Sequence, residues 1–214
     1  MKSEELVYQQ KISKRIKKVL GAAYVSVELD DRVNIGEYNG QTEIITSCTI
    51  DGDIIQICST GKGFVDALFA GVQSEIYQKY TSIEQFTFEE FKIKALLRES
   101  KNLSHSDAPV LVQMVISCQS ISNKLLCFEE LGDSIISTSM QACRQAIEFI
   151  VNAELAVKHL IEIIGNVPQN RQDLIMEYTE ELAIIVNTTD YTHVVEKFKK
   201  DLDFSGSVYY NIDS

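Results

Sequence analysis

A glycine-rich junction between an expected hairpin and an expected helix constrains this chain more than any other stretch. Two runs rich in β-branched residues are separated by Asp51-Gly52. Asp-Gly is a strong hairpin signal, because both central residues of a tight primed turn need positive φ. After the second run come two glycines and an apolar pattern at helical spacing, in the stretch Gly61-Lys62-Gly63-Phe64-Val65-Asp66-Ala67-Leu68-Phe69. The predicted order is strand, turn, strand, glycine loop, helix.

Such a junction has a packing interpretation and a functional one. Glycines let two backbones, or a backbone and a ligand, approach closely, and the helix N-terminus behind them offers unpaired N–H groups. A lone Gly-x-Gly is more often a packing turn. Gly61 and Gly63 alone therefore do not indicate a ligand site.

The same unit recurs 71 residues further along the chain. Gly132 aligns with Gly61, and Ser122-Asn123 aligns with Asp51-Gly52. Apolar positions of the second strand and the helix align as well, with Leu125, Leu126, Phe128, Ile136 and Ile147 matching Ile54, Ile55, Ile57, Val65 and Ile76. Two copies do not make a solenoid. They predict an α+β domain of two pseudo-repeated β-hairpin-plus-helix units, in which each half offers one sheet face to the other.

The two junctions also resemble a pair of motifs from a known family. The stretch from Gly61 to Leu68 is similar to the Gly-x-Gly-Pro-Val-Asp-Ala motif of the C-terminal regulatory (allosteric, dimerisation) domain of 2-isopropylmalate and citramalate synthases. The stretch from Gly132 to Ser139 resembles that domain's second motif, Asp-Ile-Ile-Glu-Ala-Ser. The resemblance extends from about residue 25 to about residue 151, with a helical C-terminal appendage beyond it.

The resemblance implies where an effector would bind. In the family, leucine lies between the two halves, near the glycine loops and the helix starts. Carried over to this chain, the effector contacts are Gly61, Gly63, Val65, Asp66, Ala67, Ser134, Ile135, Ile136 and Ser137. The chain departs from the family at Phe64, where the family has proline, and at Ser134 and Ser137, where it has acids. Asp66 is then the remaining acid for an effector's ammonium group.

Two functions stay open at this point. The first is a stand-alone regulatory module, either a homodimer or a subunit of a separate catalytic synthase chain, that binds leucine, isoleucine or a similar small effector. The second is a structural or assembly homodimer that has kept the fold and lost the ligand. Phe64 and the missing acids favour the second function, whereas the paired motifs favour the first.

We expect no catalytic activity, cofactor or metal site. The family's catalytic (β/α)₈ barrel needs about 250 residues, more than the chain has beside the regulatory domain. No His-x-His pair, Walker loop, Gly-x-Ser-x-Gly elbow or Cys-x-x-Cys pair occurs. The adjacent carboxylates Glu89-Glu90, Glu129-Glu130 and Glu180-Glu181 are interpreted as solvated charges, because neighbours do not share a face.

Composition bounds the partners and the compartment. The formal net charge of −11 argues against nucleic acid or an anionic membrane surface as a partner. No apolar run is long enough for a membrane helix, and the first residues lack the layout of a signal peptide, so we expect a cytoplasmic protein. The five cysteines are an odd number, which suits buried free thiols in a reducing compartment.

Hydrophobic periodicity predicts an N-terminal helix (1–21), the resemblance implies a regulatory-like domain (22–151), and the residues beyond the resemblance are expected to form a helical extension (152–214). The first helix has an apolar stripe that either docks on the domain or leads to a partner. Strands are predicted at 24–29, 42–50, 54–58, 86–97, 110–120 and 124–129, and a polar loop at 99–108. Helices are predicted at 3–20, 64–80, 134–165, 171–186 and 191–202.

Overall fold

The computed structural model describes residues 3–96, 109–118, 125–189 and 195, without the side chains of residues 3–7 and 188–189. The chain divides into two compact units. The sheet unit comprises Val25–Gln119 and Leu125–Val151, and the helical unit comprises the remaining segments. The predicted turn at Ser122-Asn123, the loop at 99–108 and the helix at 191–202 lie outside the described residues.

The first sheet is four-stranded and antiparallel, and β3 is its longest strand. β3 pairs with β1 and β2 along one side and with β4 along the other. The four strands are β1 (Val27–Leu29), β2 (Asn34–Tyr38), β3 (Gln41–Ile50) and β4 (Asp53–Gly61). Asp51 and Gly52 join β3 to β4 with φ angles of 56° and 81°, which confirms the predicted tight turn. Burial alternates along β3, so one face of the sheet belongs to the core.

The second sheet is a three-stranded antiparallel sheet with β6 at its centre. Its strands are β5 (Phe86–Ala95), β6 (Val110–Cys118) and β7 (Leu125–Gly132). The register of β5 shifts between Phe88 and Glu90, where a bulge interrupts the pairing with β6. Val112, Met114 and Ile116 of β6 are fully buried. β5 and β7 are the edge strands of this sheet, and among the described strands each pairs with β6 alone.

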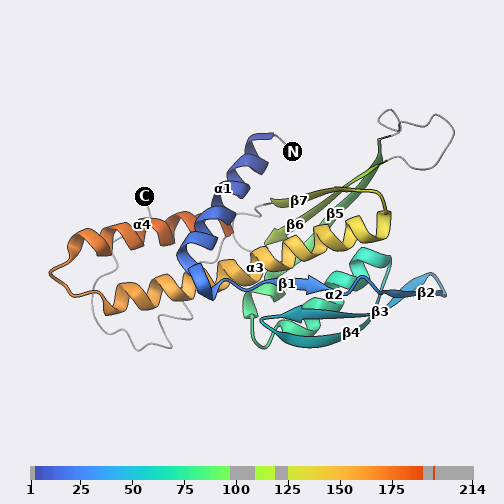
Figure 1. Ribbon diagram of the computed structural model, residues 1–214, viewed down its shortest axis with the longest axis horizontal. Coiled ribbons are helices and arrows are strands. Elements are labelled where there is room, and N and C mark those ends of the chain that lie inside the picture. Colours follow the sequence, from blue (N-terminus) through green and yellow to red (C-terminus); the bar gives the residue numbers. More distant parts are fainter. Residues whose placement is uncertain (1–2, 97–108, 119–124, 190–194, 196–214) are drawn as a thin grey trace. The chain divides into compact units, whose positions relative to one another are not determined.

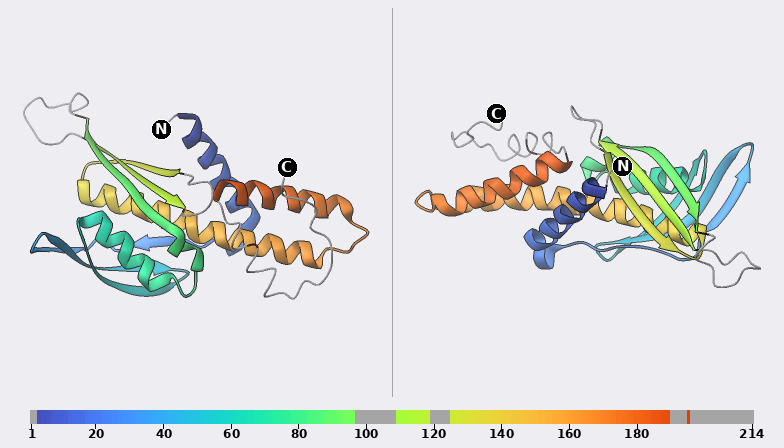
Figure 2. Two further views of the ribbon diagram at one scale, coloured as in Figure 1. Left: turned by 180° about the vertical axis from the view of Figure 1, so that it is seen from behind. Right: turned by 90° about the horizontal axis from the view of Figure 1, so that it is seen from above.

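Two helices fill the space between these sheets (Figures 1 and 2). Helix α2 (Phe64–Ile76) packs on β3 and β4, and the short 3-10 helix η2 (Thr81–Gln85) follows it. Helix α3 (Ile135–Asn166) contacts β7 of one sheet and β1 of the other through residues of its first half. The Phe149 ring lies 5.8 Å from the Phe128 ring of β7, and Glu148 accepts a hydrogen bond from the Val27 N–H of β1 at 3.1 Å.

The helical unit is built from α1 (Ser3–Leu20), the 3-10 turn η1 (Gly21–Ala23), the second half of α3, and α4 (Gln172–Thr189). Helix α1 packs on α4, and Arg15 pairs with Glu181 at 2.6 Å. Ile12, Ile16 and Leu20 of α1 are buried. The predicted apolar stripe of the first helix therefore packs within its own unit.

The expectation of a mixed α+β fold with antiparallel sheets is confirmed, but several predicted boundaries are wrong. β4 and β7 continue to Gly61 and Gly132 because polar residues still pair in the ladders, as Thr60 does with Glu43. Helix α2 ends at Ile76, four residues earlier than expected. β1 begins at Val27, three residues later than expected. Among the helices in the described part of the chain, none combines the length and apolarity needed to span a bilayer.

Candidate functional site

The first junction joins β4 to α2 through two residues. β4 ends at Gly61, and Gly63 is the N-cap of α2 in an extended conformation. The first helical hydrogen bond runs from the Ala67 N–H to the Gly63 carbonyl at 2.9 Å. A Cβ placed on Gly61 would stand 2.5 Å from the Ala67 nitrogen and 2.8 Å from Asp66 Oδ2. Gly61 is therefore required by the close approach of strand and helix, since its φ is not in the left-handed region.

The second junction, from β7 to α3, has the same layout. β7 ends at Gly132, α3 begins at Ile135, and the Thr138 N–H donates to the Ser134 carbonyl at 2.9 Å. A Cβ on Gly132 would collide with the Thr138 hydroxyl. The Ser137 N–H donates to Ser134 Oγ at 3.4 Å, as in a helix cap. Each of these residues stands 71 positions after its counterpart in the first junction.

Both helices begin at the same end of the sheet unit, so the two junctions share that end (Figures 1 and 2). The first turn of a helix carries N–H groups without intrahelical partners and the positive end of the helix dipole. Each helix start therefore favours a carboxylate or another anion.

The predicted site residues differ in what they present to solvent. Val65 and Ala67 are buried, so an effector would meet the backbone of this turn and not their side chains. Gly61, Gly63 and Asp66 are half-buried, and Ser134 and Ser137 are exposed. Ile135 and Ile136 are 51% and 42% exposed, which is unusual for isoleucine. The second junction therefore offers apolar side chains and the first offers mainly backbone.

Asp66 already has a partner inside the junction. Its Oδ2 accepts the backbone N–H of Lys62 at 2.9 Å. Asp66 is the third residue of α2, and an acid there can reach back to the chain before the helix, as in a capping box. A carboxylate in the first turn also stabilises the helix dipole. This contact supplies a structural role for Asp66 that does not involve a ligand.

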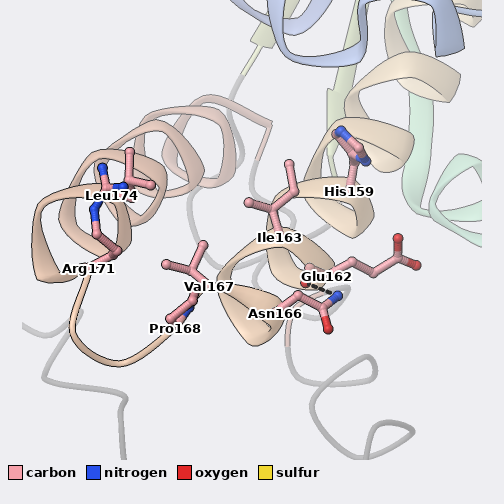
Figure 3. A pocket seen from close by; sticks show the side chains of 8 residues that line it. All are labelled: His159, Glu162, Ile163, Asn166, Val167, Pro168, Arg171 and Leu174. Carbon is pink, nitrogen blue, oxygen red and sulfur yellow. Dashed lines mark hydrogen bonds between the residues drawn. The ribbon is translucent and has the colours of Figure 1, made fainter.

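A shallow cavity of about 480 Å³ lies elsewhere, in the helical unit where α3 turns into α4 (Figure 3). It is lined by His159, Glu162, Ile163, Asn166, Val167, Pro168, Arg171 and Leu174. Two of its polar side chains have partners: Arg171 makes two hydrogen bonds to Asp173, at 3.0 and 2.8 Å, and the Asn166 amide donates to the Glu162 carbonyl at 2.9 Å. These contacts stabilise the turn between α3 and α4.

A second cavity, of about 630 Å³, lies on the outer face of the first sheet beside Asp30 and Gln56. The backbone N–H of Arg32, then its guanidinium, lowers the pKa of the Asp30 carboxyl below its usual value. Ser47 also donates to Asp30 at 3.3 Å. Within the described residues, no group of three or more His, Cys, Asp or Glu side chains is arranged to hold a metal ion.

The interpretation of the paired carboxylates as solvated charges is wrong for Glu129, Glu130 and Glu181, which are half-buried, whereas Glu89 and Glu90 are exposed; all five have a side-chain partner, Glu90 with Lys92 at 2.6 Å. Glu89 accepts the Ser117 hydroxyl at 2.5 Å, and Glu129 accepts the Gln113 amide at 2.5 Å. Glu130 accepts the Gln145 amide, and Glu181 binds Arg15. Adjacent residues do point to different faces, but in each case one of those faces meets a polar neighbour.

The cysteines are all free, as expected, but one of them is not buried. Burial raises the pKa of the Cys48 thiol to about 12 and that of Cys127 to about 11. Burial also raises the pKa of Cys143. Cys58 is exposed because its side chain alternates to the outer face of edge strand β4.

Sequence reasoning missed three residues that shape this region. Leu131, the residue before Gly132 on β7, is 58% exposed. Gly71 lies so close to β4 that a Cβ would stand 2.5 Å from Ser59 Oγ. Ser59 itself donates to the Ala67 carbonyl at 2.6 Å. A glycine inside a helix costs about 1 kcal/mol relative to alanine, so Gly71 was a detectable sign of close packing.

Comparison with known proteins adds no relative. No protein-family model matches the chain, and no characterised protein matches its sequence.

Proposed function

We propose that the sheet unit is a regulatory and dimerisation module that resembles the leucine-binding domain of 2-isopropylmalate synthases. In this proposal it binds a branched-chain amino acid or a similar small effector and regulates a catalytic chain. The observation that carries the proposal is the matched pair of junctions. Gly61 and Gly132 each end a strand, and each lacks room for a Cβ. In both cases two residues separate the glycine from the first residue of the helix.

The chemistry of the two junctions suits such an effector. Its carboxylate would bind the N–H groups at the start of α2, near Gly63 and Val65, where helix geometry leaves them without intrahelical partners. Its branched side chain would contact Ile135 and Ile136, which are exposed in the first turn of α3. Its ammonium group would need a carboxylate, and Asp66 is the acid that lies within the first turn of either helix.

A second function, a dimer that has kept the fold and lost the ligand, is favoured by two observations. Ser134 and Ser137 stand where the family has acids. Asp66 is engaged with the Lys62 N–H. Under this alternative, the exposed isoleucines of α3 and Leu131 would contact a protein partner.

Differential scanning fluorimetry separates the two functions. A regulatory module should gain thermal stability with millimolar leucine, isoleucine or the corresponding 2-keto acids, because a ligand that binds the folded state stabilises it. Ile136→Ser should lose this gain, whereas Ile93→Ser, an equally exposed isoleucine on β5, should keep it. A wild-type protein whose melting temperature is unaffected by all of these ligands would favour the assembly function.

A further inference from the structure

One edge of the first sheet lacks the features that usually prevent strands from pairing across molecules. β4 pairs with β3 over nine residues without a bulge, and no other described strand pairs with it. It contains no proline, and Asp53 at its first position is its one charged residue. Natural sheets protect their edges with short strands, charges, proline or bulges, and β4 has almost none of these.

The other described edges carry such protection. β5 has the bulge at Phe88/Glu90 and the charged residues Lys92 and Lys94. β7 has Glu129 and Glu130 near its centre, so pairing with itself would bring like charges together. β1 and β2 are three and five residues long. β4 is therefore the exception within the described sheets.

The turn at Asp51-Gly52 determines which groups of β4 face outward. A two-residue primed turn places its flanking residues, Ile50 and Asp53, in a hydrogen-bonded pair. Alternate residues of β4 from Asp53 onward then bond to β3. The intervening residues direct their N–H and C=O groups away from β3, and they are Ile54, Gln56, Cys58 and Thr60. All four are exposed, and Ile54 is 72% exposed.

We propose that β4 pairs antiparallel with β4 of a second copy of this chain, around a two-fold axis at Gln56. In this register Gln56 lies opposite the partner's Gln56, and Ile54 lies opposite the partner's Cys58. Cys58 is the cross-strand neighbour of Ile45, which is 46% exposed. Each Ile54 is thus placed against Cys58 of the other chain, with Ile45 one strand further into that chain's sheet.

This self-complementarity is the reason to choose a second copy and not a foreign strand. The exposed Ile54 and the apolar pair of Cys58 and Ile45 lie on the same surface of one chain. A two-fold axis therefore places Ile54 of each chain against the apolar pair of the other. The outward residues are uncharged, so two chains of formal charge −11 meet where neither carries charge on the contacting strand segment. The proposal assigns a surface to the dimer proposed above, but it stands on the strand edge and not on the glycine junctions.

Disulfide trapping tests the register. In a Cys58→Ser background, Gln56→Cys places two thiols opposite each other, with Cα atoms about 5.5 Å apart, inside the range for a disulfide. Thr60→Cys in the same background is the matched control, because its partner would be eight residues away along the strand, roughly 27 Å. We expect covalent dimers of the Gln56→Cys protein alone on non-reducing gels after incubation in a glutathione redox buffer. Equal trapping of both variants, or of neither, would overturn the proposal.

Sedimentation equilibrium provides an independent measurement. Gln56→Lys places like charges opposite each other and should weaken the dimer by about fivefold or more, whereas Thr60→Lys should leave it nearly unchanged. A wild-type chain that is monomeric, or a Gln56→Lys dimer as tight as the wild type, overturns the proposal. If the Gln56→Lys protein dimerises as tightly as the wild type and still binds leucine, the β4 pairing is wrong and the proposed function stands. If the Gln56→Cys protein forms covalent dimers but binds no effector, the β4 pairing stands and the proposed function is wrong.

Discussion

The backbone nitrogen of Ala67 stands 2.5 Å from the point that a Cβ on Gly61 would occupy, so β4 can enter α2 only through a residue without a side chain. The obstacle is backbone at the start of a helix, which cannot rotate aside as a side chain can. At the second junction the obstacle to a Cβ on Gly132 is the Thr138 side chain and not backbone. The close approach at Gly61 therefore fixes how α2 leaves β4.

Gly61→Ala should therefore destabilise the sheet unit by about 1–3 kcal/mol, the usual cost of forcing an extra methyl group into a packed site. Gly36→Ala is the matched control, because the nearest atom to its Cβ would be 4.0 Å away. We expect the control to be as stable as the wild type. Urea denaturation of the three proteins measures the difference, and equal stability of Gly61→Ala and wild type would contradict the packing argument.

Asp66→Asn tests the role of the acid at the start of α2. Asparagine keeps an acceptor for the Lys62 N–H but loses the charge near the helix N-terminus, so the free energy of unfolding should fall by a few tenths to about 1 kcal/mol. If Asp66 also binds the effector's ammonium, its removal should weaken binding by about 1.5–3 kcal/mol. Denaturation and calorimetry on the same protein separate these effects. Unchanged affinity would assign Asp66 to the helix cap alone.

Restoring the second motif's acids gives a gain-of-function test. Ser134→Asp with Ser137→Glu returns the residues found in the family, and both positions are exposed, so the fold should tolerate the change. An amino-acid effector should bind more tightly, because its ammonium gains a charged partner. The corresponding 2-keto acid, which lacks the ammonium, should gain nothing. Equal gains for both ligands would count against this placement of the amino group.

Thiol reactivity should report the burial of the cysteines. At pH 8 an Ellman assay of the native protein should titrate one thiol per chain, Cys58, and Cys58→Ser should titrate none. In urea the wild type should titrate all five cysteines. The raised pKa values of Cys48 and Cys127, about 12 and about 11, keep those thiols protonated in the folded chain. More than one fast thiol would mean that the core opens readily.

The same thiols predict a loss of stability in alkali. Cys48 titrates at about 12 when folded, against an ordinary value of 9.0, so the unfolded chain loses this proton first. The stabilisation is complete below pH 9 and disappears as the pH rises toward 12, by about 1.4 kcal/mol per pH unit for each such thiol. Urea denaturation from pH 8 to 11 should show a shallower slope for Cys48→Ala than for wild type.

Local chemistry explains which features could be predicted from the sequence. Asp51-Gly52 specifies its turn because few residues other than glycine, asparagine and aspartate adopt positive φ easily, and the helices carry long periodic stripes. The ends of strands are harder to predict from the sequence, because polar residues such as Thr60 remain in a ladder when the partner strand continues. The exposure of Cys58 could not be predicted, because it depends on which face of β4 packs on the core. The hydrogen bond from Lys62 to Asp66 likewise depends on the exact path of the junction.

Isothermal titration calorimetry of the wild-type protein with L-leucine and L-isoleucine tests the central claim most directly. The account predicts saturable heat for at least one of these amino acids, with the heat strongly reduced in Ile136→Ser and retained in Ile93→Ser. Ligand at concentrations up to about 10 mM covers the weak affinities expected for a small effector, since a dissociation constant of 1 mM corresponds to about −4 kcal/mol. Heats equal to ligand dilution for both amino acids would contradict the regulatory function and leave the assembly function in its place.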